Sequence, residues 1–164
     1  MRFVPRVVLE KDGRFRLELP PEERDVLRTL PAQLRELLTE GEGAADPSLQ
    51  RLFPPAYADD PSREAEFHEM VHDDLLEGKL TAIATMESTI DAERLTEDEL
   101  LAWLGALNDL RLVLGTRLDV TEGTDFEDFE GDPREGVAAL YWYLGALEED
   151  VVEALAGFAE ADGR

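Results

Sequence analysis

The segment HEMVH, residues 68–72, carries both histidines of the chain and is the first candidate for chemistry. His68 and His72 stand one helical turn apart, the spacing at which two imidazoles bind one zinc ion, and Glu69 would be the general base of a metallohydrolase. Such a site needs a third protein ligand, and Asp91 would lie about 30 Å away on a continuous helix. The sequence therefore predicts no metal site, no cofactor and no catalytic residue. A zinc-dependent hydrolase is kept as an alternative hypothesis.

An acidic segment between residues 119 and 132 is a second candidate for metal binding. Its stretch DVTEGTDFEDFE has the length of a calcium-binding EF-hand loop. Thr124, however, occupies the sixth position, where the turn requires glycine, and Gly123 occupies the fifth, where a ligand is required. We therefore expect a solvated acidic loop rather than a calcium site.

Arg111 is the charged residue whose position most needs an explanation. It lies at the centre of a leucine cluster on the helical wheel of residues 96–118, so we expect it to be buried. An unpaired guanidinium there would cost several kcal/mol, so the sequence predicts an ion pair with a carboxylate. Asp74 is the expected partner and Glu77 the second choice, since both lie on the preceding helix. A structural ion pair is the favoured interpretation, and an anion site around Arg111 is the alternative.

A β-hairpin is predicted at the N-terminus, ahead of the helices that carry these residues. Two β-prone runs flank Asp12-Gly13, whose tolerance of positive φ is typical of a two-residue turn. In that register Val8 pairs with Leu17. Pro20 and Pro21 end the second strand.

A mainly α fold follows from the helical periodicity of the rest of the chain. Three Asp-Pro pairs and one capping box, Thr96 with Glu99, mark helix starts. Pro31 should kink the first helix or split it near Thr29. We expect a single domain over residues 1–164, with a hairpin at 1–20 and a bundle of about four to five helices at 21–160 that includes an acidic loop near 119–132. The predicted helices cover residues 21–38, 47–52, 61–91, 96–118 and 133–160.

The charge of the chain limits its partners. Thirty-nine acidic and 16 basic side chains give a net charge of −23, which repels phosphate backbones and anionic lipids. We therefore expect no membrane binding and no direct binding of nucleic acid. The first 16 residues are the exception because they are basic, with the cations Arg2, Arg6, Lys11, Arg14 and Arg16. A regulator that binds DNA through this basic hairpin is therefore an alternative hypothesis. This edge could equally lie against the protein's own acidic body.

Two features that the sequence lacks narrow the possible chemistry and location of the protein. The chain has no cysteine, which excludes disulfides, thiolate metal sites and cysteine nucleophiles. The N-terminal sequence lacks the apolar run of a signal peptide, and no stretch reaches the roughly 18 apolar residues that span a bilayer. We expect a cytoplasmic protein.

Four stretches resemble one family: DPSLQRLFPPAY, DDLLEGKL, AWLGALNDLRLVLGTRL and YWYLGALEEDVVEAL. They are similar to the actinomycete AosR-like oxidative-stress regulators, first described as a domain of unknown function, and NDLRLVLG is the most specific block. The resemblance implies a cytoplasmic regulator that acts through a protein partner in transcription. A role that depends on cysteine oxidation cannot operate within this cysteine-free chain.

The leading hypothesis is a non-enzymatic regulatory protein that binds another protein in transcription or a stress response. Its acidic surface favours a partner with a basic surface, because opposite charges speed the encounter. A homodimer through the last helix, with its aromatic run of residues 141–143, is left open, since a packing pattern does not separate internal from intermolecular contacts.

Overall fold

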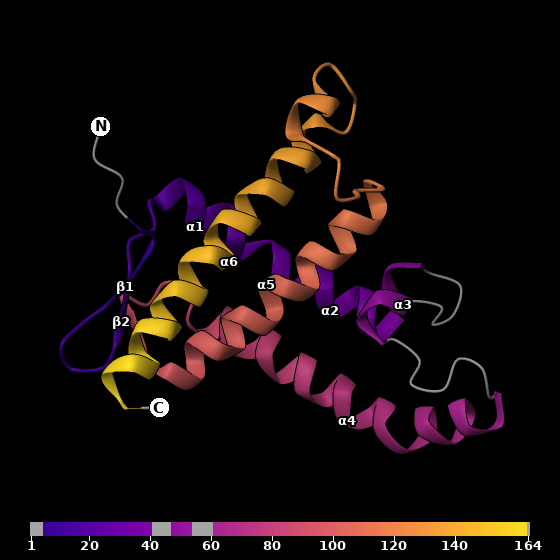
Figure 1. The fold of residues 1–164 in the computed structure, drawn as a ribbon, viewed down its shortest axis with the longest axis horizontal. Coiled ribbons are helices and arrows are strands. Elements are labelled where there is room, and N and C mark those ends of the chain that lie inside the picture. The colour runs from indigo at the N-terminus through magenta and orange to yellow at the C-terminus, as the bar shows by residue number, and fades with distance from the viewer. Residues whose placement is uncertain (1–4, 41–46, 54–60, 164) are drawn as a thin grey trace.

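The computed structural model describes residues 5–40, 47–53 and 61–163, with only the backbone described at residues 40, 48, 50 and 61–70. The predicted mainly α fold, a β-hairpin followed by a helical bundle, is confirmed (Figure 1). The strands are β1 (Val7–Leu9), β2 (Phe15–Leu17) and β3 (Arg94–Leu95). The helices are α1 (Pro21–Arg28), α2 (Leu30–Glu40), α3 (Pro47–Leu52), α4 (Pro61–Ser88), α5 (Glu97–Arg117), the 3-10 helix η2 (Phe126–Phe129) and α6 (Glu135–Ala161).

The hairpin has the predicted strands but a longer turn. Val8 pairs with Arg16, so the predicted pairing of Val8 with Leu17 is wrong by one residue. Residues 11–13 form the turn, which is closed by an amide-to-carbonyl bond of 2.8 Å between the flanking residues. Gly13, the last turn residue, has a φ of +85°, which glycine adopts without steric cost. The extra residue in the turn moves the whole register by one position.

A third strand, β3, completes the sheet and was not predicted. It pairs antiparallel with β2, so the strand order is β1-β2-β3. β3 lies between α4 and α5 in the sequence and is only 2 residues long. A segment of that length has no periodicity that a sequence pattern could reveal.

Proline positions set several of the helix boundaries. α3 and α4 begin at Pro47 and Pro61 as predicted, whereas α6 begins at Glu135, two residues after Pro133. The break near Thr29 is confirmed, because α1 ends one residue before it and α2 begins one residue after it. The ring of Pro31 is the cause, since it would clash with the carbonyl four residues earlier in a continuous helix.

The central helix of the molecule is α5. It packs against α3, α4 and α6, and Figure 1 shows it crossing between α4 and α6. Leu100, Trp103 and Leu107 on this helix are 0% exposed. α5 is apolar over much of its circumference.

Among the residues that the structure describes, no helix is both long enough and apolar enough to cross a membrane.

The last helix, α6, joins the bundle to the sheet. Its buried residues Leu144, Leu147 and Val151 lie in the same core as α5. Near its C-terminal end, the Phe158 ring lies 5.7 Å from the Phe15 ring of β2, measured between centroids. The C-terminal end of α6 therefore lies beside the hairpin (Figure 1).

The predicted capping box at the start of α5 is confirmed and gives a first stability prediction. The Thr96 hydroxyl accepts a bond from the Glu99 amide at 3.2 Å, and the Glu99 carboxylate accepts one from the Thr96 amide at 2.8 Å. Thr96→Ala should lower the free energy of unfolding by about 1 kcal/mol, measured by urea denaturation. Thr81→Ala, at an exposed position inside α4, is the control and should have little effect or stabilise slightly. Equal losses in the two variants would contradict the capping argument.

Candidate functional site

The HEMVH segment lies on the first half of α4. The His72 ring packs against Phe53, with 4.6 Å between ring centroids. Asp91, considered above as a third ligand, follows α4 and forms an ion pair with Arg28 at 2.7 Å. Among the side chains that the structure describes, no three His, Asp or Glu groups gather closely enough to hold a metal ion. The side chains of His68 and Glu69 lie outside the described residues, so the zinc hypothesis rests on the sequence pattern alone.

The acidic segment 119–132 forms a loop that contains η2. Asp128 accepts a hydrogen bond from the Asp125 amide at 2.9 Å, and Asp132 forms an ion pair with Arg134 at 3.2 Å. Phe129 is buried and lies 6.0 Å from the ring of Trp142 on α6. The loop is thus held against α6 by an aromatic contact. The Asp128 carboxylate bonds a backbone amide of the loop, and the Asp132 carboxylate bonds Arg134 at the start of α6.

Arg111 forms its ion pair with α6 and not with α4. Its Nη1 donates to the Glu148 carboxylate at 2.7 Å. The predicted partner Asp74 and the second choice Glu77 are therefore both wrong, and both are exposed on α4. Arg111 is also only half-buried, with 31% of its side chain exposed. The error has a physical cause: α5 has neighbours on several sides, and a helical wheel shows a buried face without showing which helix covers it.

The Arg111 guanidinium lies against the surface of α6. Its central carbon is 5.1 Å from the centroid of the Tyr141 ring, a cation–π distance. A Cβ at Gly145 would come within 3.3 Å of the guanidinium, so the lack of a side chain there provides the necessary space. An external anion would have to compete with Glu148 for the same cation. The contacts therefore favour a structural ion pair over an anion site.

A second ion pair, between Lys79 on α4 and Asp109 on α5, was not predicted. The Lys79 Nζ lies 3.0 Å from each carboxylate oxygen of Asp109. Only 9% of the Asp109 side chain is exposed, so burial raises the pKa of this carboxyl group, while Lys79 acts in the opposite direction. The sequence signal was present, because Asp109 lies on a largely apolar helix just as Arg111 does.

The outer face of α6 beside Arg111 contains an open groove of about 650 Å³. Its apolar lining includes Trp142 and Val152, and Val152 is 49% exposed. Three glutamates contribute to the lining, whereas its single cation, Arg111, is already paired. An apolar strip with carboxylates beside it can receive a segment that is both apolar and basic. We call this the α6 groove; it is lined by Arg111, Trp142, Gly145, Ala146, Glu148, Glu149, Val152 and Glu153.

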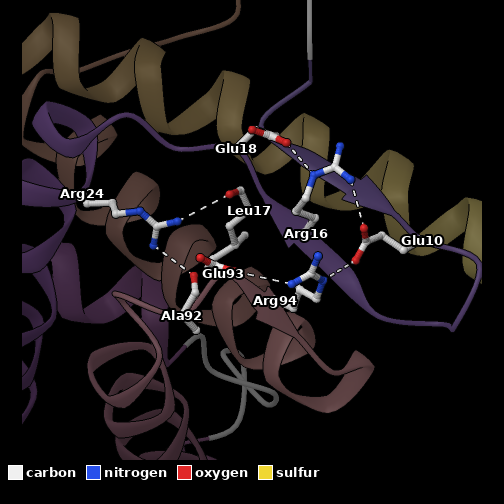
Figure 2. A network of polar contacts seen from close by, with 8 residues as sticks. All are labelled: Glu10, Arg16, Leu17, Glu18, Arg24, Ala92, Glu93 and Arg94. Atoms are coloured by element: carbon white, nitrogen blue, oxygen red, sulfur yellow. Dashed lines mark hydrogen bonds and ion pairs between the residues drawn. The ribbon is translucent and has the colours of Figure 1, made fainter.

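Two basic residues of the hairpin, Arg6 and Arg16, are paired with carboxylates of the same chain, and Figure 2 shows the contacts of Arg16. Glu10 accepts hydrogen bonds from Arg16 at 2.9 Å and from Arg94 at 2.6 Å, and Arg6 donates to Glu23 at 2.7 Å. Of the other cations, Lys11 and Arg14 are exposed, and Arg2 lies outside the described residues. For Arg6 and Arg16, these contacts agree with the interpretation that the basic edge lies against the protein's own acidic groups. Lys11 and Arg14 have no such partner among the residues that the structure describes.

Arg24 of α1 joins segments that are far apart in the sequence (Figure 2). Its Nη1 donates to the carbonyl oxygens of Ile90 at 2.6 Å and Ala92 at 3.1 Å, just after α4. Its Nη2 donates to the carbonyl of Leu17 in β2 at 3.4 Å, and its Nε to that of Leu19 at 3.3 Å. Arg24 therefore connects α1 to the hairpin and to the turn that follows α4.

Comparison with known proteins finds one family model and several relatives that match over most of the chain. The family model described as a domain of unknown function, DUF2017, matches residues 5–155. The chain is 27% identical to the putative oxidative stress regulator AosR of Mycobacterium leprae, over 92% of this chain and 86% of that protein. It is 26% identical to the oxidative stress regulators AosR of Mycobacterium bovis and Mycobacterium tuberculosis, over 90% of this chain and 85% of each relative. No solved structure matches the chain.

Proposed function

Because the chain belongs to the DUF2017 family, we propose that it is a non-enzymatic regulatory protein of a stress response that acts by binding another protein. The family resemblance predicted from the sequence is confirmed by this match and by the AosR relatives. The relatives' name, oxidative stress regulator, supports a regulatory role. Because this chain has no cysteine, the proposal includes no thiol oxidation within it.

The α6 groove is the observation that carries the proposal. It combines two apolar side chains, the half-buried Trp142 and the exposed Val152, with the carboxylates of Glu148, Glu149 and Glu153. Aromatic and aliphatic groups at the centre of an interface supply most of the binding energy, while charged groups around them select the partner. The partner that fits this pattern presents an apolar segment flanked by lysine or arginine.

The charge of the whole chain favours the same kind of partner. A net charge of −23 creates a negative potential that attracts a basic protein before contact. This attraction acts mainly on the association rate and is screened by salt. The α6 groove would then determine where the partner binds.

Two acidic groups with a raised pKa lie outside the α6 groove. Burial raises the pKa of two acidic groups, the Asp109 carboxyl and the Tyr143 hydroxyl. Asp109 is paired with Lys79 inside the α4–α5 interface, and Tyr143 lies half-buried beside Arg6. Groups with shifted pKa values are candidates for catalysis when they line a cleft, but neither of these two lines the α6 groove.

Charge reversal in the groove tests the proposal. The wild-type protein and a Glu149→Lys/Glu153→Lys variant are used to capture partners from the native host, and each captured protein is identified by mass spectrometry. The double variant should lose a basic partner that the wild type retains. For that purified partner, the association rate should fall at least about tenfold as the salt concentration rises from low to moderate ionic strength.

A matched variant controls for the change in total charge. Asp73→Lys/Glu77→Lys alters the same number of exposed carboxylates at the same spacing on α4. This control should retain the partner, because it leaves the α6 groove intact. Equal capture by the two charge-reversed variants, or an association rate that does not change with salt, would overturn the proposal.

A further inference from the structure

A second hollow of the molecule lies between α2, α5 and α6 and is separate from the α6 groove. Its volume is about 340 Å³, and most of its lining consists of leucine and valine side chains, among them Leu34, Leu114 and Leu140. Pockets that bind small molecules begin at about 300 Å³ and are mostly apolar with a few polar groups. We call this the α2–α5–α6 pocket.

The polar groups of the α2–α5–α6 pocket are positively charged or neutral. They are Gln33, Arg117 and Arg134, and all three residues are exposed, so they lie where the pocket meets solvent. Arg134 is already paired with Asp132 at 3.2 Å. Arg117 forms no hydrogen bond or ion pair with any part of the chain that the structure describes, although its place in the last turn of α5 favours a cation. No acidic side chain contributes to this lining, in a chain whose net charge is −23.

We propose that the α2–α5–α6 pocket binds a small amphiphilic carboxylate, with its apolar chain among the leucines and its carboxylate on Arg117. A guanidinium can donate two parallel hydrogen bonds to one carboxylate, and Arg117 has its donors available. The N-terminal end of α6, which begins at Glu135, adds the partial positive charge of a helix start. The proposal goes beyond the binding of a protein partner and does not depend on it.

The lining of the pocket decides which kind of small molecule it can hold, because the walls are apolar and the polar groups carry positive charge or none. A cationic amphiphile would place its charge beside Arg117, which has no partner among the described residues, and a neutral amphiphile would leave that guanidinium unused. A carboxylate satisfies both the apolar walls and the charge.

Calorimetric titration with sodium decanoate, kept below its micellar concentration, tests the head group. Decanoate should bind at one site and about tenfold more tightly than decan-1-ol, which has the same chain without the charge, and decyltrimethylammonium should bind more weakly still. Arg117→Gln should reduce decanoate affinity about tenfold, to the level of the alcohol. Arg14→Gln removes a charge from an exposed position on the hairpin and should leave the affinity unchanged.

A second variant tests whether the apolar chain occupies the pocket. Val137 lines the pocket and is 42% exposed, so Val137→Phe adds volume there without repacking the core. This variant should unfold at the wild-type temperature and lose binding of both decanoate and decan-1-ol. The proposal is overturned if decanoate does not bind, if the alcohol binds equally well, or if Val137→Phe binds decanoate as the wild type does.

Discussion

Replacing Trp103 with alanine should lower the free energy of unfolding by about 3 to 5 kcal/mol, measured by urea denaturation. Trp103 is 0% exposed in the N-terminal half of α5, so its removal deletes a large apolar contact area and leaves a cavity. Its indole Nε1 also donates to the Thr89 hydroxyl at 2.7 Å. Thr89 keeps its own bond to the Thr85 carbonyl, also at 2.7 Å, so most of the loss comes from packing.

Two further variants interpret this loss: the first removes the hydrogen bond while keeping most of the packing, and the second is a control at an exposed position of the same helix. Trp103→Phe keeps most of the apolar volume and should cost clearly less than Trp103→Ala. Leu101→Ala alters a residue of the same helix that is 47% exposed, and it should change stability by no more than about 0.5 to 1 kcal/mol. If Trp103→Ala were no more destabilising than Leu101→Ala, α5 would not be the centre of the core.

Lys79→Met should destabilise the protein by about 2 to 3 kcal/mol at neutral pH, because it leaves the Asp109 carboxylate buried without its cation. Asp109 has 9% of its side chain exposed and Lys79 has 21%, so the expected loss is somewhat below that for a fully buried pair. Methionine retains the apolar length of the lysine side chain, which separates the loss of charge from the loss of packing. Chemical denaturation of both proteins at several pH values measures the effect.

The loss of folding stability caused by Lys79→Met should become smaller as the pH falls. Burial already raises the pKa of Asp109, and Lys79 opposes that shift, so removing Lys79 raises the pKa further. An acid with a higher pKa in the folded state than in the unfolded state binds its proton more tightly when folded. The folded state therefore regains stability as the pH falls through the folded pKa, and the recovery is complete below the unfolded pKa of about 3.9.

The double variant Lys79→Met/Asp109→Asn provides the control for this pH dependence. Asparagine cannot ionise, so the stability difference between the double variant and the wild type should lack the recovery on acidification that Lys79→Met shows. General effects of acid on a highly charged protein are removed by comparing each variant with the wild type at the same pH. If the loss of folding stability in Lys79→Met stayed constant from pH 7 to pH 4, Asp109 would not be the group whose protonation restores stability.

The parts of the fold that the sequence predicted are those set by local interactions. The capping box at Thr96, the break at Thr29 and the helix starts at Pro47 and Pro61 each depend on a few neighbouring residues. The register of the hairpin was wrong because it depends on the number of turn residues. A glycine at position 13 is compatible with both a two-residue and a three-residue turn.

The candidate sites depended on contacts between helices, and here the sequence was less informative. The wheel of α5 indicated that Arg111 needs a carboxylate, but it did not indicate Glu148. A usable signal was present in α6, where Tyr141, Gly145 and Glu148 recur at spacings of four and three and so share one face with an aromatic ring, a gap and an acid. Both the α6 groove and the α2–α5–α6 pocket require the three-dimensional arrangement of helices.

The guanidinium of Arg24 has a consequence for local unfolding. It bonds carbonyl oxygens just after α4 and in the hairpin from a position on α1, so none of these segments can separate without breaking several of its hydrogen bonds. A lysine, with a single nitrogen, could not hold this arrangement. We therefore expect α1, the hairpin and the turn after α4 to behave as one foldon, whose amide protons exchange with solvent through a common opening event.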